Sequence, residues 1–114
     1  MTVALAQTFL GREVHVTVDR PVGYRHPVHG FVYELNYGFV PGTRVADGEG
    51  LDAYLVGVDE PVASATGLCV AVIHRLYDDD PKLVVAVDRR NRSDEELLAR
   101  ISFQEAGYPH VVVR

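Results

Sequence analysis

The residues of this chain best suited to chemistry form an acidic run, Asp47-Gly48-Glu49-Gly50-Leu51-Asp52. The run contains three carboxylates, which repel one another unless a cation neutralises them. Their oxygens suit hard cations such as Mg²⁺ or Mn²⁺. In an extended chain Asp47 and Glu49 point the same way, and a bend at Gly50 would bring Asp52 beside them. Alone, the segment fits a solvated Asp-Gly turn better than a metal site. The alternating apolar residues that follow, however, predict that Asp52 lies on a strand and is directed away from its apolar face.

A second acidic run, Asp78-Asp79-Asp80, separates two apolar segments and is followed by Lys82. Adjacent aspartates are usually a solvated turn, and this position predicts the connection of a hairpin. The strand before the turn ends with His74 and Arg75, so carboxylates and cations gather where strands end, a common place for function on a rigid scaffold. His74 and Arg75 fit a satisfied strand-end pair and a substrate contact equally well.

The elements that must position these residues are mainly strands. Val14, Val16 and Val18 alternate with polar residues, which predicts a half-buried strand. Further strands are predicted over residues 30–36, 51–58, 68–76, 83–87 and 111–113. Many short strands at close spacing predict a small β-barrel or curled sheet.

One good helix is predicted, and it begins near the C-terminal end of the sequence. Ser93-Asp94-Glu95-Glu96 has the form of a capping box, with Ser93 as the N-cap. Leu97, Leu98 and Ile101 form an apolar stripe, and Gly107 is a suitable stop. This helix is expected to cover one side of the sheet.

Length and composition restrict the class of protein. The 114 residues fit one domain (1–114), and 47% apolar with 24% charged residues is ordinary for a soluble globular protein. A net charge of −5 argues against a general nucleic-acid binder. No apolar run approaches the ~18 residues that would cross a membrane, and residues 1–10 do not fit a signal peptide. Cys69, the single cysteine, is expected in the core, and this usage fits a reducing, cytoplasmic compartment.

Two ordered motifs resemble the soluble, metal-dependent (family I type) inorganic pyrophosphatases. The first is Asn36-Tyr37-Gly38-Phe39-Val40-Pro41-Gly42-Thr43 followed by the acidic run, and the second is Asp80-Pro81-Lys82-Leu83-Val84-Val85-Ala86-Val87. The chain is similar to a short member of that family, with the match concentrated in residues 30–88. The resemblance implies a mainly β (α+β) fold, a small closed OB-like β-barrel with one C-terminal helix packed on it. It also implies Mg²⁺-dependent hydrolysis of pyrophosphate to two phosphates. A homo-oligomer is compatible with the resemblance.

The resemblance also implies roles for individual residues. Asp47, Glu49, Asp52 and Asp80 would be metal carboxylates, with Asp78 as a looser fifth position. Glu49, which stands where the family usually has aspartate, would be the base for the attacking water, and Asp52 would share the catalytic site. Phosphate would be bound by Tyr37 and Lys82. A metal lowers the pKa of such a water, and positioning and electrostatics supply most of the rate.

The cationic half of the family's site is not matched. The expected N-terminal glutamate, lysine and arginine have no secure counterparts, and neither does a Tyr-Lys pair on the C-terminal helix. Arg20, Arg25, His26 and Arg75 are candidate replacements, since arginine forks suit phosphate oxygens; His26 also fits a turn. The alternatives are a related hydrolase of a nucleotide or other organic phosphate, and a barrel that binds a phosphorylated ligand without catalysis.

Overall fold

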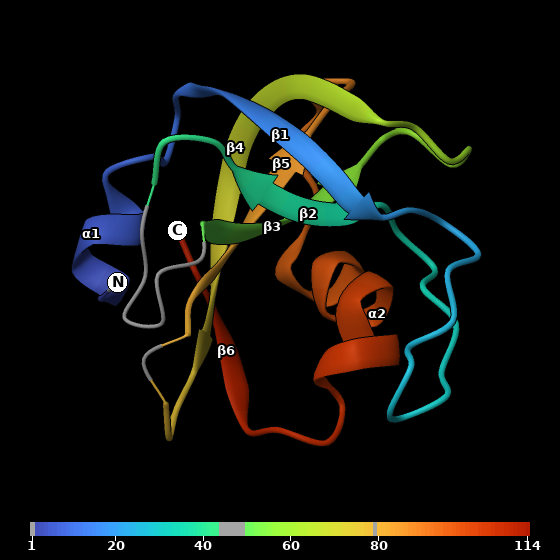
Figure 1. Cartoon of the computed structure of the whole chain (residues 1–114). Coiled ribbons are helices and arrows are strands. Elements are labelled where there is room, and N and C mark those ends of the chain that lie inside the picture. The colour runs from blue at the N-terminus through green and yellow to red at the C-terminus, as the bar shows by residue number, and fades with distance from the viewer. Residues whose placement is uncertain (1, 44–49, 79) are drawn as a thin grey trace.

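The computed structural model describes residues 2–43, 50–78 and 80–114 (Figure 1). Its elements are α1 (Val3–Gln7), β1 (Glu13–Arg20), β2 (Tyr37–Val40), β3 (Leu51–Val56), β4 (Ser64–Arg75), β5 (Lys82–Ala86), α2 (Asp94–Glu105) and β6 (His110–Val113). The strand order is β1-β2-β3-β5-β4, and β4 pairs again with β1, which closes a five-stranded barrel. β6 pairs with the C-terminal end of β4. The predicted mainly β fold, an OB-like barrel with a C-terminal helix, is therefore confirmed.

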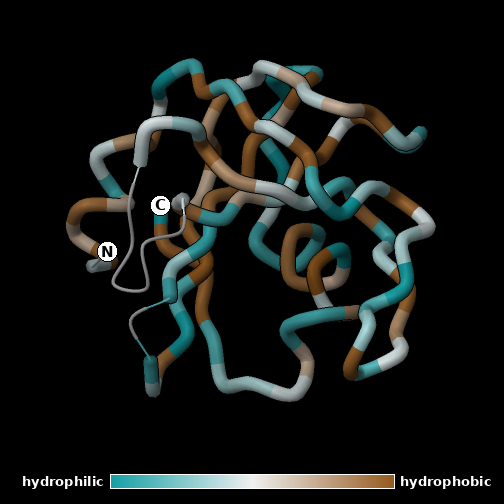
Figure 2. Tube along the Cα trace, viewed as in Figure 1, coloured by the Kyte–Doolittle hydropathy of each residue, from teal (hydrophilic) through white to brown (hydrophobic). Residues whose placement is uncertain are grey.

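The barrel has apolar residues on both of its faces. β5 is buried along its whole length, and β3 is buried at all but one position, because side chains point alternately into the barrel and toward α2. Leu55 packs inside the barrel, whereas its neighbour Tyr54 packs outside in the cluster that contains Leu97 of α2. β3 and β5 run parallel, and such doubly buried parallel strands are near-continuous apolar runs. Figure 2 shows these brown segments at the centre of the trace.

The C-terminal helix α2 begins where the sequence predicts. The Ser93 side chain accepts a hydrogen bond from the Glu96 amide at 3.2 Å, which satisfies one of the free donors at the helix start. Leu97 and Ile101 are fully buried against the barrel. In Figure 1, α2 lies between β6 and the β1–β2 connection. No helix in the described residues is long and apolar enough to cross a membrane.

Two expectations about secondary structure are wrong. Residues 30–36 do not form a strand; the chain there makes a single bridge, Arg25 with Val32, before β2 begins. The predicted alternation of burial is present, with Tyr33 fully buried, but these side chains pack near α2 instead of following a strand ladder. The second error concerns the number of helices. The N-terminal residues form the short helix α1, whose Ala6 packs into the barrel core.

The turn after β5 supports a test of acid stability. Asp88 accepts hydrogen bonds from the Arg90 amide and from Nη1 and Nη2 of Arg92, at 3.1, 3.1 and 2.7 Å. The Arg92 hydrogen bonds lower the pKa of Asp88 from 3.8 to about 2. The lowered pKa contributes stability that is complete above pH 4 and is lost as the pH falls toward 2. In urea unfolding at stepped pH, Asp88→Asn should therefore lose less stability than the wild type across this window. Parallel losses in both proteins would contradict the assignment.

Candidate functional site

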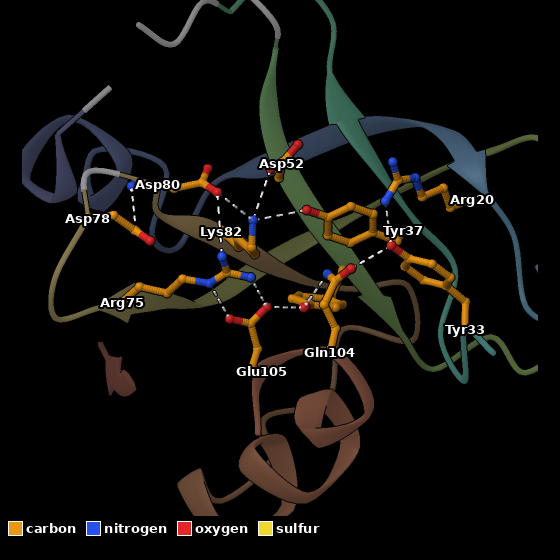
Figure 3. A network of polar contacts seen from close by, with 11 residues as sticks. Arg20, Tyr33, Tyr37, Asp52, Arg75, Asp78, Asp80, Lys82, Gln104 and Glu105 are labelled. Atoms are coloured by element: carbon orange, nitrogen blue, oxygen red, sulfur yellow. Dashed lines mark hydrogen bonds and ion pairs between the residues drawn. The ribbon is translucent and has the colours of Figure 1, made fainter. Parts of the chain in front are cut away.

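Lys82 is the centre of a cluster that joins three strands. Its ammonium donates to the Tyr37 hydroxyl at 3.0 Å, to Oδ2 of Asp52 at 3.0 Å and to Oδ2 of Asp80 at 3.1 Å (Figure 3). The Lys82 side chain is only 3% exposed, whereas Asp52 and Asp80 remain 26% and 42% exposed. The ammonium thus lies at the floor of the site, and the two carboxylates rise toward solvent.

Strand register brings these residues together. Asp52 is aligned with Lys82 across the parallel β3–β5 pair, and with Phe39 on β2. Tyr37 lies two residues before Phe39 and therefore on the same face of β2. Glycine is needed next to it, because a Cβ on Gly38 would lie 1.8 Å from the Thr17 carbonyl oxygen of β1. In this motif Tyr37 therefore supplies a side chain of the site, and Gly38 allows β1 and β2 to lie close together.

The Tyr37 hydroxyl is kept protonated. Burial raises its pKa well above 10, and the nearby carboxylates of Asp52 and Asp80 raise it further. The oxygen accepts from Lys82 and retains its own proton for donation. Tyr37 is therefore a neutral hydrogen-bond donor at ordinary pH.

A second buried ion pair lies beside the first. Glu105 of α2 is fully buried and accepts from Nε and Nη2 of Arg75 at 2.7 and 3.1 Å. Burial acts to raise the pKa of Glu105, but the hydrogen bonds from Arg75 and Tyr54 outweigh it and lower the pKa. The third guanidinium nitrogen, Nη1, lies 3.9 Å from Asp80. Glu105 thus fixes Arg75 so that one edge of its guanidinium faces the Lys82 cluster.

Hydrogen bonds continue from this pair to the other side of the site. Gln104 donates to the Tyr54 hydroxyl at 2.7 Å and accepts from the Tyr33 hydroxyl at 2.5 Å. Tyr33 in turn accepts from Nη1 of Arg20 at 2.7 Å. Figure 3 shows this series of hydrogen bonds, which crosses from α2 to the end of β1. One network therefore holds both Arg20 and Arg75 in place, although their strands, β1 and β4, are far apart in the sequence.

Part of this network lines a pocket of about 530 Å³. Its polar lining consists of Asp19, Arg20, Asp52, Arg75, Asp80, Lys82 and Gln104. Its aromatic lining consists of His26, His29, Phe31, Tyr37, Phe39 and Tyr108, and Gly50 completes it. A concave site with convergent polar groups and shifted pKa values is the usual form of a small-molecule or active site.

The structure places seven of the eleven candidate residues in this pocket. They are Arg20, His26, Tyr37, Asp52, Arg75, Asp80 and Lys82. His26 also holds a turn, since its Nδ1 accepts from the amides of Val28 and His29 at 3.1 Å.

Two further candidates, Arg25 and Asp78, are not among the described residues that line the pocket. Arg25 donates to the Gly30 carbonyl at 2.8 Å, within its own loop. Asp78 accepts from the Asp80 amide at 3.2 Å and so shapes the β4–β5 connection. Asp47 and Glu49 lie outside the described residues.

Sequence reasoning missed Glu105, Gln104, Tyr54 and Tyr33. Glu105 had a readable signal, because it continues the spacing of the buried residues Leu97 and Ile101 along α2. A charged residue in register with a buried stripe requires a partner, since an unpaired buried charge is strongly unfavourable. The identity of that partner, Arg75 on β4, has no signal in the local sequence.

The donor chemistry of the pocket fits a divalent cation in part. Asp52 and Asp80 converge on a single point, where an ammonium now neutralises them. Carboxylate oxygens are the ligands that Mg²⁺ and Mn²⁺ prefer. Within residues 2–43, 50–78 and 80–114, no three carboxylate, histidine or cysteine side chains form a metal-binding group. The described pair would therefore supply part of a coordination shell.

Solved structures with a similar fold include inorganic pyrophosphatases. The enzyme from Ehrlichia chaffeensis is 19% identical, with a TM-score of 0.58 over 88% of this chain and 73% of that one. The enzyme from Coxiella burnetii is 19% identical, with a TM-score of 0.57 over 88% and 83%. The enzyme from Helicobacter pylori is 17% identical, with a TM-score of 0.59 over 88% and 81%. No protein-family model and no curated protein matches the sequence. At these identities the likeness shows the barrel fold.

Proposed function

We propose, from this barrel fold and from the cluster around Lys82, that the chain hydrolyses phosphoric anhydrides with a divalent metal, and that inorganic pyrophosphate is a substrate. One observation carries the proposal. Two separate sequence motifs supply one cluster. The Tyr37 hydroxyl and the carboxylates of Asp52 and Asp80 all lie within 3.1 Å of the Lys82 ammonium nitrogen. Two unrelated acidic segments would not be expected to converge on one buried cation.

The cations and donors of the pocket suit a phosphorylated ligand. Lys82 offers a compact charge, and the guanidinium groups of Arg20 and Arg75 offer planar forks for phosphoryl oxygens. Tyr37 adds a neutral donor. Because these groups are held by hydrogen bonds before a ligand arrives, they need little rearrangement to stabilise charge that develops during reaction.

The acidic residues would hold the metal. We propose Asp52 and Asp80 as metal ligands, Asp47 and Glu49 as further ligands, and Asp78 as a looser one. A bound Mg²⁺ or Mn²⁺ would neutralise phosphate charge and lower the pKa of a coordinated water. We assign the proton acceptor for that water to Glu49.

Asp52→Asn tests the proposal. Phosphate release from pyrophosphate in Mg²⁺ should fall at least about 100-fold, because the substitution removes a charge at the reacting centre. Asp59→Asn is the matched control, since Asp59 is a surface carboxylate, 87% exposed, and paired only to Arg100 among the described residues. Equal rates for the wild type and Asp52→Asn would remove this site from the reaction.

A further inference from the structure

The pocket is large enough for an organic ligand. Its volume of about 530 Å³ is within the range that holds a small organic molecule. Asp52, Arg75, Asp80 and Lys82 form one charged cluster in its lining, called the charged end below. The lining also contains three rings, His26, His29 and Phe31, which are called the aromatic wall below. A ligand composed only of phosphoryl groups would leave this wall unused.

The aromatic wall is a connected surface that begins next to the charged end. The His26 ring lies 4.7 Å from the His29 ring and 5.0 Å from the Phe31 ring, measured between centroids. His26 is also nearly parallel to Tyr33, at 6.4 Å. Tyr33 lies 5.6 Å from Tyr37, whose hydroxyl contacts Lys82. One molecule could therefore reach from Lys82 to the wall.

The wall differs from the aromatic residues of the core. Tyr33 and Tyr54 are fully buried, and their hydroxyls are hydrogen-bonded, whereas His29 is exposed and Phe31 is half-buried. In the described part of the chain, the His29 ring makes no hydrogen bond. Burial lowers the pKa of His26, and the nearby Arg20 and His29 lower it further, which favours the neutral ring. Accessible aromatic rings of this kind are suited to stacking.

We propose that the aromatic wall stacks the base of a nucleoside di- or triphosphate, so that the hydrolysed anhydride can carry a nucleoside. The inference rests on the proposed hydrolysis of phosphoric anhydrides. A flat base needs only the faces of the rings.

The reaction balances with water as the only co-reactant. For a nucleoside triphosphate, the water oxygen forms a bond to the terminal phosphorus. The bond from that phosphorus to the bridging oxygen breaks, and the electron pair stays with the nucleoside diphosphate. Orthophosphate and a proton are released.

The experiment compares anhydrides that differ in the nucleoside. Hydrolysis of ATP, GTP, CTP and UTP is measured against inorganic tripolyphosphate and pyrophosphate in Mg²⁺. We expect kcat/KM for at least one nucleotide to exceed that for tripolyphosphate by about tenfold, the usual contribution of one base stacked on an aromatic side chain. Slower hydrolysis of all four nucleotides than of tripolyphosphate would overturn the inference.

Two variants then connect the preference to the wall. His29→Ala removes an exposed ring, and Phe31→Leu keeps volume at a half-buried position while removing the ring. Each should lower the ratio of nucleotide to tripolyphosphate kcat/KM by about tenfold. Val28→Ala is the matched control, since Val28 is on the same loop, 78% exposed and not part of the pocket lining. An unchanged ratio in both wall variants would refute the assignment.

Failure of the inference is distinguishable from failure of the proposed function. If the wild type hydrolyses pyrophosphate but no nucleotide, the hydrolase proposal stands and the nucleoside does not. If it hydrolyses none of the anhydrides, the hydrolase proposal is wrong, and titration calorimetry then tests whether the aromatic wall binds a base. In that case ATP must bind more tightly than tripolyphosphate, and His29→Ala must reduce the difference. Equal affinities would reject the base site.

Discussion

Replacing Glu105 by alanine is expected to lower the free energy of unfolding by about 3–5 kcal/mol, because it leaves a largely buried arginine without its partner. The Arg75 side chain is 13% exposed, and Glu105 supplies both oxygens of its bidentate contact. The Tyr54 hydroxyl loses its acceptor in the same change. Domains of this size are stable by about 5–15 kcal/mol, so the loss is a large fraction of the total. Urea denaturation followed by circular dichroism measures it.

Two further variants separate the charge from the packing. Glu95→Ala, on an exposed position of the same helix, should change stability by less than about 1 kcal/mol. The double variant Arg75→Met, Glu105→Leu removes both charges and should be more stable than Glu105→Ala, since a buried ion pair can be replaced by apolar residues of similar volume. Wild-type stability in Glu105→Ala would show that the ion pair does not stabilise the fold.

Lys82→Met is expected to make the stability of the protein depend on a divalent cation. The substitution leaves the Asp52 and Asp80 carboxylates converging without the ammonium that neutralises them. Their repulsion should lower Tm in chelator, and Mg²⁺ should raise Tm more in the variant than in the wild type. Pyrophosphate hydrolysis should still fall about 100-fold in saturating Mg²⁺, because phosphate loses a buried cation. Differential scanning calorimetry with and without Mg²⁺ gives the first result, and a phosphate-release assay gives the second.

Lys82→Arg is the matched variant, since it retains the charge but not the compact ammonium. It should keep more of the stability in chelator than Lys82→Met does. Lys82 is also the only lysine of the chain, so acylation of its side-chain amine reports on this one site. The buried amine should react slowly in the folded wild type. If Mg²⁺ stabilised the wild type and Lys82→Met equally, the two carboxylates would not be a cation site.

The sequence by itself determined the features that depend on near neighbours. The alternation of valines predicted β1, and Ser93 predicted the start of α2, because both are set by spacing along a few residues. Tyr37, Asp52 and Lys82 were also identified from short motifs, and the structure brings them together. The barrel with a C-terminal helix followed from the number and order of these elements together with the resemblance of the motifs.

Only the tertiary structure decided which surface buries each apolar residue and which partner each charge takes. The alternation near Tyr33 reports a buried face, but it does not distinguish a strand from a connection packed near α2. The acidic motif contains Asp52, yet the parallel register of β3 and β5 is what aligns it with Lys82. Glu105 and Arg75 meet because a helix folds back on a strand thirty residues away. Periodicity in the sequence indicates that a side chain is buried. Its partner depends on contacts between distant parts of the chain, which no local pattern encodes.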